Sequence, residues 1–131
     1  MTEIKTEKVV VEKSPKEVFN FLSDMNNLRK LMPPQVTYWV NTENDCTFTV
    51  TGMASLGLKY EKKNPDSEII FSRHGKVLFD YFLRCNIEPV GDISSLQLNL
   101  EADLNPFLKM MAEKPLTNFL KYLAERLPQV I

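Results

Sequence analysis

Two cysteines, one histidine and four tyrosines are the side chains of this 131-residue sequence that could act as nucleophiles, acids or bases. Cys46 and Cys85 lie on the apolar faces of two separate alternating stretches and lack CxxC spacing, which predicts two reduced, buried thiols. His74 lies in Arg73-His74-Gly75-Lys76, which indicates an exposed tight turn with no neighbouring partner for a general base. One histidine and two distant cysteines do not supply the ligands of a zinc or iron site, so we expect no metal.

The sequence also lacks the short motifs that mark common cofactor and nucleophile sites. There is no GxGxxG, P-loop or GxSxG pattern, and four glycines are few for a phosphate-binding loop. No carboxylate falls on a clearly inward position, and the tyrosine hydroxyls are the main polar groups expected inside. We therefore assign no catalytic residue and expect no cofactor. If the protein were an enzyme, Tyr60, Tyr81 and His74 would be the candidates.

Composition and charge narrow the class of protein. Sixteen basic residues against seventeen acidic ones give a net charge of −1, which argues against nucleic-acid binding. No apolar run approaches the roughly 18 residues that a membrane span needs. The first ten residues, MTEIKTEKVV, contain no apolar signal-peptide core, so we expect a cytoplasmic protein. The length predicts a single domain over residues 1–131.

The expected elements begin with a strand over residues 2–13, two short helices and a polar-apolar alternating region. Ser14-Pro15-Lys16-Glu17 forms a capping-box pattern that starts the first helix, and Asp24 can cap the second, which ends at Pro33-Pro34. From residue 35 to residue 103 the apolar residues recur every second position, which predicts six antiparallel strands with one buried face. One of these strands is expected to begin at Val77.

A long amphipathic helix is predicted over residues 106–127, after an Asn105 N-cap. It is the only element large enough to cover the apolar face of the sheet. The expected fold is therefore α+β: a seven-stranded curved antiparallel sheet wrapped around a long C-terminal helix, with a cavity between them. Trp39 shares a strand phase with Thr37 and Asn41, so it either faces outward, at a cavity rim or partner surface, or packs beneath the short helices.

Two segments resemble those of a known superfamily. The opening SPKEVFNFLSDMNNLRKLMP and the closing LNPFLKMMAEKPLTNFLKYLAERL look like the START-related helix-grip superfamily, also described as Bet v 1-like or SRPBCC-type. Its members include polyketide cyclases, aromatases, plant pathogenesis-related allergens and lipid-transfer domains. The resemblance implies a hydrophobic ligand tunnel between the sheet and the final helix. It implies no catalytic residue, because the superfamily has none in common.

These observations lead to one preferred function and two alternatives. The preferred one is binding or transport of a small hydrophobic molecule, such as a lipid, an isoprenoid or an aromatic polyketide, by a monomer or homodimer. The alternatives are a cyclase, aromatase or dehydratase and a protein-interaction or chaperone-cofactor domain. The expected ligand-binding residues are Phe48, Met53, Leu58, Tyr60, Phe79, Tyr81, Leu98, Met111 and Phe119.

Overall fold

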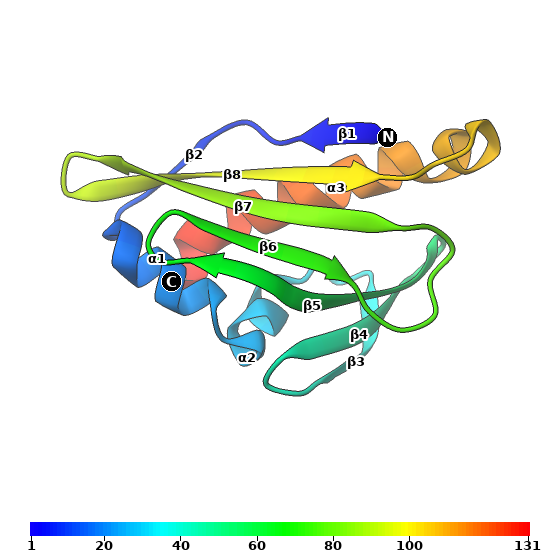
Figure 1. Ribbon diagram of the computed structural model, residues 1–131, viewed down its shortest axis with the longest axis horizontal. Helices are drawn as coiled ribbons and strands as arrows, with labels where there is room; N and C mark the ends of the chain where they lie inside the picture. Colours follow the sequence, from blue (N-terminus) through cyan, green and yellow to red (C-terminus); the bar gives the residue numbers. More distant parts are fainter.

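The computed structural model describes residues 1–131 and shows a curved antiparallel sheet that wraps around a long C-terminal helix (Figure 1). The strand order across the sheet is β1-β8-β7-β6-β5-β4-β3, and β2 also pairs with β8. This is the α+β helix-grip arrangement expected from the sequence. The strands are β1 (Thr2–Lys5), β2 (Val9–Val11), β3 (Val36–Asn41), β4 (Asp45–Val50), β5 (Ala54–Asn64), β6 (Glu68–Arg73), β7 (Tyr81–Val90) and β8 (Ile93–Ala102).

The helices are α1 (Pro15–Leu22), α2 (Met25–Leu28), the 3-10 turn η1 (Arg29–Leu31) and α3 (Pro106–Val130). The predicted capping box is present: the Ser14 hydroxyl accepts the Glu17 N–H at 3.2 Å, and the Glu17 carboxylate accepts the Ser14 N–H at 3.4 Å. Asn105 caps α3 by accepting the Leu108 N–H at 2.8 Å. The short helices close one end of the curved sheet, and α3 begins at the opposite end (Figure 1).

The first predicted strand, residues 2–13, is two strands that pair with successive parts of β8, so the sheet has eight strands rather than seven. The break lies at Thr6. Its hydroxyl accepts the Leu98 N–H at 3.0 Å, and its carbonyl accepts the Gln97 side chain at 2.8 Å. These side-chain bonds replace part of the regular backbone ladder, a local disruption of the kind that divides a strand. Because β1 and β2 both pair with β8, they share one place in the strand order, and the sheet is still seven strands wide, as expected.

The phase predicted for β3 is wrong beyond Thr37. Tyr38 has a φ of +54°, and the pairing of β3 with β4 shifts between Thr37 and Val40. An extra residue in a strand reverses the direction of the side chains that follow it. Tyr38 and Val40 are therefore 83% and 65% exposed, whereas Trp39 turns inward and stacks on Phe48 at 5.4 Å between ring centroids. Trp39 is thus partly buried and packs against the hydrophobic core.

Strand β7 begins at Tyr81, not at Val77. The preceding strand β6 ends at Arg73, and β8 ends at Ala102, the partner of Tyr81. Residues 77–80 consequently have no neighbouring strand on either side. The inward direction of Phe79 and Tyr81 is nevertheless as the alternation indicated, because both side chains are buried.

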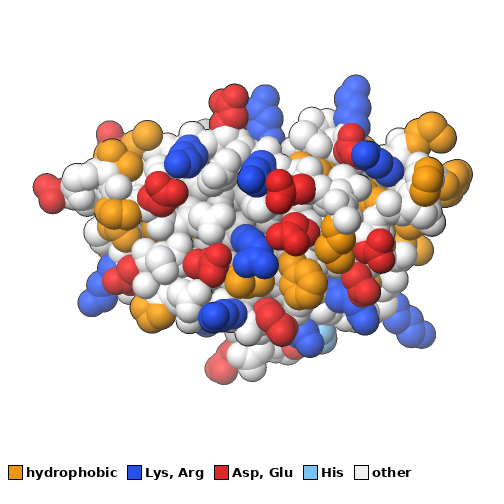
Figure 2. Space-filling view, turned by 45° about the horizontal axis from the view of Figure 1, so that its top comes forward, with side chains coloured by type: hydrophobic (Ala, Val, Ile, Leu, Met, Phe, Trp, Pro, Cys, Tyr) orange, Lys and Arg blue, Asp and Glu red, His pale blue; other side chains and the backbone are white.

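Thirty buried hydrophobic residues fill the space between the concave face of the sheet and the helices. Helix α3 contributes one continuous face, whose buried residues are Ala112, Leu116, Phe119, Leu120, Leu123, Ala124 and Leu127. Both cysteines are buried and unpaired, as predicted. On the face shown in Figure 2, acidic and basic side chains are interspersed. None of the helices has the length and hydropathy needed to span a membrane.

Candidate functional site

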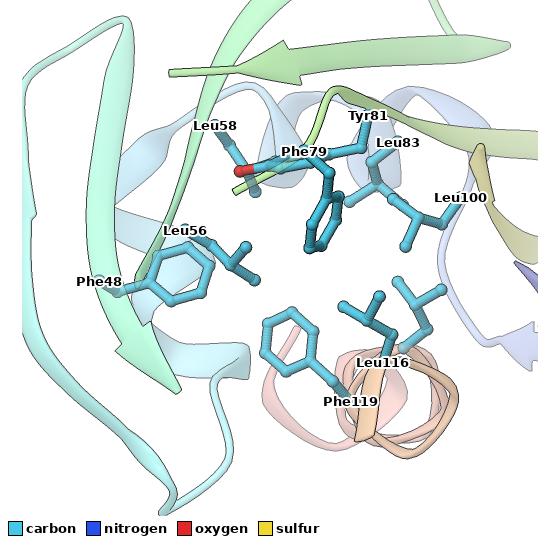
Figure 3. A pocket seen from close by; sticks show the side chains of 10 residues that line it. Phe48, Leu56, Leu58, Phe79, Tyr81, Leu83, Leu100, Leu116 and Phe119 are labelled. Carbon is cyan, nitrogen blue, oxygen red and sulfur yellow. The ribbon is translucent and has the colours of Figure 1, made fainter. Parts of the chain in front are cut away.

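An apolar pocket lies between the concave face of the sheet and the middle of α3 (Figure 3). Its volume is about 20 Å³, close to the space that one water molecule requires. All ten lining residues are hydrophobic: Phe48, Leu56, Leu58, Phe79, Tyr81, Leu83, Leu100, Leu116, Phe119 and Leu120. They come from β4, β5, β7, β8, α3 and the segment before β7. The pocket lies where the helix-grip arrangement was expected to leave a cavity, but at this volume it is not the open ligand tunnel that the resemblance implied.

Aromatic rings from separate elements narrow this pocket. Phe48 from β4, Phe79 from the segment before β7, and Phe119 from α3 point toward the same central space (Figure 3). The Phe48 and Phe119 ring centroids are 5.9 Å apart, and Phe79 packs edge-on against Tyr81 at 5.6 Å. Since Trp39 also stacks on Phe48, the three rings form an aromatic row of successive contacts from β3 to α3. Movement of Phe48 or Phe119 would therefore change the surroundings of Trp39.

Tyr81 carries the only polar side-chain atom in the lining, and that atom is already bonded. Its hydroxyl donates to the carbonyl oxygen of Gly57 at 2.6 Å and accepts the Gly57 N–H at 2.9 Å. Burial raises the pKa of Tyr81 to about 12, although the bond to Gly57 partly opposes this shift. The hydroxyl therefore stays protonated at neutral pH and its hydrogen is directed at the backbone rather than at the pocket.

Tyr60, expected in the binding site, lies outside this pocket. Its hydroxyl donates to the carbonyl oxygen of Leu22 at 2.7 Å, at the end of α1. Its ring packs on Phe71 at 4.9 Å, and the Lys63 ammonium lies 4.0 Å from the ring centroid. Burial, with a smaller contribution from the Asp24 charge, raises the pKa of Tyr60. Tyr60 therefore anchors α1 to the sheet.

The structure brings five of the nine expected ligand-binding residues together around the pocket: Phe48, Leu58, Phe79, Tyr81 and Phe119. Besides Tyr60, three others lie elsewhere. Leu98 is buried in another part of the core, Met53 is half-buried in the turn before β5, and Met111 is 43% exposed on α3.

Five lining residues were missed from the sequence: Leu56, Leu83, Leu100, Leu116 and Leu120. Their spacing from predicted residues could have identified three of them. Leu83 lies two residues after Tyr81, on the same strand face, and Leu116 and Leu120 lie on the same helix face as Phe119.

His74 lies away from the apolar pocket. Its Nε2 is 3.6 Å from the Asp45 carboxylate, and its side chain is 36% exposed, so the expected exposed turn residue is in fact partly covered. The neighbouring Arg73 pairs with Asp80. His74 and Arg73 line a polar surface groove together with Glu61 and Ser72. None of these groups reaches the pocket beside α3.

The thiols are also poorly suited to chemistry. Burial raises the pKa of both Cys46 and Cys85 to about 12, so the nucleophilic thiolate is strongly disfavoured at neutral pH. No cluster of three or more His, Cys, Asp or Glu side chains has the geometry to hold a metal ion. The interior is therefore an apolar space, and burial keeps its thiols and the Tyr81 hydroxyl in their neutral forms at neutral pH.

Comparison with solved structures places this arrangement among known folds. A START superfamily protein from Mycobacterium smegmatis is 19% identical, with 98% of this chain and 99% of that chain covered and a TM-score of 0.67. A protein from Thermus thermophilus is 17% identical, with coverages of 98% and 95% and a TM-score of 0.75.

The di-domain ARO/CYC protein BexL, from the BE-7585A biosynthetic pathway, is 13% identical with a TM-score of 0.66. The match covers 96% of this chain and 46% of that one. At these identities the similarity concerns the fold.

No curated protein sequence matches the chain significantly. The whole chain, residues 1–131, does match a sequence family described as polyketide cyclase / dehydrase and lipid transport. The helix-grip fold and the apolar pocket beneath its terminal helix agree with that match. The chain belongs to the polyketide cyclase/dehydrase and lipid transport family.

Proposed function

We propose that this protein binds a small hydrophobic molecule between the sheet and α3. One observation carries the proposal: the pocket has a wholly hydrophobic lining, and its single polar atom is already bonded to Gly57. A polar ligand group placed there would lose its hydrogen bonds to water without replacement, whereas apolar surface gains about 25 cal/mol per Å² buried. The family description, which includes lipid transport, supports the same class of ligand.

The volume of the pocket requires side chains to move when a ligand binds. Pockets for drug-sized molecules measure roughly 300–1,000 Å³, far above the 20 Å³ between these side chains. Phe48, Phe79 and Phe119 belong to three separate elements and narrow the pocket, so the ligand needs at least one of these rings to turn aside. The free energy of ring movement lowers the apparent affinity, because only the open conformation accepts the ligand. We therefore expect moderate affinity and a clear response of the aromatic row.

A binding role is favoured over a cyclase or dehydratase reaction by the positions of the proton-transferring groups. Such reactions need an acid or base within hydrogen-bonding reach of the substrate. Tyr60 bonds to Leu22, His74 lies near Asp45, and the Tyr81 hydroxyl is directed at Gly57. A role based on an exposed patch around Trp39 is also less favoured, since the Trp39 ring stacks against Phe48.

Trp39 makes the proposal directly testable, because it is the only tryptophan in the chain. The purified protein is titrated with straight-chain alcohols of six to fourteen carbons and with naphthalene, while Trp39 fluorescence and the melting temperature are recorded. A saturable change in emission together with a raised melting temperature is expected. If no compound in the series changes either signal, the proposal is wrong.

Two variants serve as the matched pair in this titration. Leu116→Phe adds bulk directly into the pocket and should abolish the response, with circular dichroism confirming that the variant is folded. Phe82→Leu alters a side chain outside this pocket, on the solvent-facing side of β7, and should leave the response unchanged. Native mass spectrometry of the purified protein complements the titration by revealing any small molecule that remains bound through purification.

A further inference from the structure

Phe119 separates the apolar pocket from a second, larger space. A surface groove of about 420 Å³, also lined by Phe119, runs between α3 and the segments that join η1 to β3 and β4 to β5. The groove is lined by Pro33, Gln35, Val50, Thr51, Lys114, Pro115, Asn118, Phe119 and Tyr122. Phe119 is the one residue that lines both spaces, and it is only 8% exposed. A single aromatic ring is thus common to the walls of both spaces.

The groove differs from the pocket in its chemistry. Lys114, Asn118 and Tyr122 recur every fourth residue along α3 and so share one face of that helix. Gln35 and Thr51 face them from the other wall. These five side chains provide an ammonium, two amides and two hydroxyls.

Lys114 is the only charged residue in the groove lining, and no carboxylate accompanies it. The adjacent acidic residue on the helix, Glu113, is paired instead with Lys109 at 3.8 Å. The groove therefore presents a positive charge and several hydrogen-bond donors beside an apolar interior.

We infer that the pocket and the groove become one binding site when Phe119 turns aside, and that its ligand is a single-chain amphipathic carboxylate. This inference rests on the proposed function and adds the ligand class to it. The hydrocarbon chain lies in the apolar pocket, and the carboxylate lies in the groove within reach of Lys114 and Asn118. Charge-assisted bonds to a carboxylate are stronger than those to a neutral hydroxyl, so the head group determines selectivity.

The aromatic row couples this movement to Trp39. Phe119 packs on Phe48 at 5.9 Å, and Phe48 stacks on Trp39 at 5.4 Å. Turning Phe119 toward the groove removes the first of these contacts and frees Phe48 to shift. The tryptophan emission therefore reports opening even though Trp39 lines neither space.

The head-group test compares sodium decanoate with decan-1-ol at pH 8 by Trp39 fluorescence. Lys114→Gln should weaken decanoate binding by about fivefold or more and leave decan-1-ol within about twofold. Lys121→Gln is the matched control, because Lys121 is an exposed lysine of the same helix that lines a different groove. Equal effects of Lys114→Gln on both probes, or no effect on either, would overturn the assignment of the carboxylate to this groove.

The gate test compares two phenylalanines. Phe119→Ala joins the pocket to the groove, whereas Phe79→Ala enlarges the pocket from a wall that the groove does not share. Phe119→Ala should speed decanoate association by about tenfold or more, because the open conformation no longer has to form first, and Phe79→Ala should not. The association rates are measured by surface plasmon resonance, because Phe119→Ala removes the contact that links Phe119 to Trp39. Phe119→Leu, which preserves more of the core, repeats the comparison if the alanine variant does not fold. Equal association rates in the Phe119 and Phe79 variants would contradict the gate.

The two proposals fail in different ways. If decan-1-ol binds the wild-type protein but Lys114→Gln does not discriminate between the probes, the hydrophobic site stands and the amphipathic ligand is wrong. If neither probe binds the wild-type protein or any folded variant, both proposals are wrong.

Discussion

The Tyr81 hydroxyl bridges the two polar backbone groups of Gly57, donating to its carbonyl oxygen at 2.6 Å and accepting its N–H at 2.9 Å. Tyr81 begins β7 and Gly57 lies in β5, so the phenol reaches across the line of β6. It does so next to the point where β6 ends, after Arg73. The Tyr81 hydroxyl thus accepts the Gly57 N–H beyond the end of β6, whereas the Gly57 carbonyl oxygen also accepts the His74 N–H at 3.2 Å. The same tyrosine forms part of the apolar pocket.

Removing this hydroxyl should cost stability rather than binding. Tyr81→Phe leaves the buried Gly57 N–H without its side-chain acceptor, while the Gly57 carbonyl oxygen keeps the His74 N–H. We expect a loss of about 1–3 kcal/mol in the free energy of unfolding. Urea denaturation measures it. Tyr38→Phe is the control, because Tyr38 is 83% exposed and should change stability by less than about 0.5 kcal/mol. Equal stability of Tyr81→Phe and the wild-type protein would show that the bridge contributes nothing.

Gly57 itself should tolerate no side chain. A Cβ at this position would lie 2.0 Å from the His74 carbonyl oxygen and 3.0 Å from the Cys46 carbonyl oxygen, both of which are backbone atoms. Gly57→Ala must therefore push neighbouring strands apart, and we expect more than about 3 kcal/mol of destabilisation or failure to fold. Ser55→Ala, on the exposed side of the same strand, should behave like the wild-type protein. A normally stable Gly57→Ala variant would contradict the close packing of Gly57 against the backbone of His74 and Cys46.

The buried thiols predict a loss of stability at alkaline pH. In the folded protein the pKa of Cys46 and of Cys85 is about 12, compared with an ordinary value of 9.0. Folding therefore favours the protonated form of both thiols. Their contribution to the free energy of unfolding is complete below pH 9 and is lost as the pH rises from 9 to about 12. Tyr81 acts in the same direction above pH 10.

Urea titrations at a series of pH values between 7 and 11 should show this decline. Iodoacetamide labelling at pH 8 provides the complementary measurement, since the folded protein should react far more slowly than the protein in urea. Rapid labelling of either cysteine under native conditions would contradict the burial of that thiol.

His74→Ala distinguishes binding from catalysis. Because His74 lies outside the apolar pocket, the affinity for decan-1-ol should stay within about twofold of the wild-type value, as measured by Trp39 fluorescence. The melting temperature should change little as well, since the side chain is partly exposed. A variant that bound a polyketide-like substrate normally but no longer converted it would instead support the cyclase alternative.

The order of elements could be predicted from the sequence because each signal was local and unambiguous. Ser14 and Asn105 marked helix starts, and the regular alternation after residue 81 marked β7 and β8. Strand limits and side-chain directions were predicted wrongly where contacts with distant parts of the chain determine them. Thr6 divides the first strand through bonds to β8. The bulge at Tyr38 reverses the phase of β3, and no residue type in that stretch signals it.

The site was harder to predict than the fold. Inward-facing residues could be recognised, but position along an element decides which of them meet at the pocket. Leu98 and Leu100 share one face of β8, yet only Leu100 lines the pocket. The hydroxyls of Tyr60 and Tyr81 looked equivalent, and their partners, Leu22 and Gly57, lie 38 and 24 residues away. The groove beside Phe119 depends on the approach of α3 to the segment before β3 and to the end of β4, which no local pattern encodes.

The bulge in β3 also affects how the molecule behaves at high concentration. This strand forms one free border of the sheet, and such borders can recruit a strand from another molecule to start an aggregate. The left-handed backbone at Tyr38 interrupts the regular spacing of the outward N–H and C=O groups. A strand from a second chain therefore cannot form a continuous ladder of backbone hydrogen bonds with β3. The same distortion that turns Trp39 inward thus disfavours fibril-like stacking along this edge of the sheet.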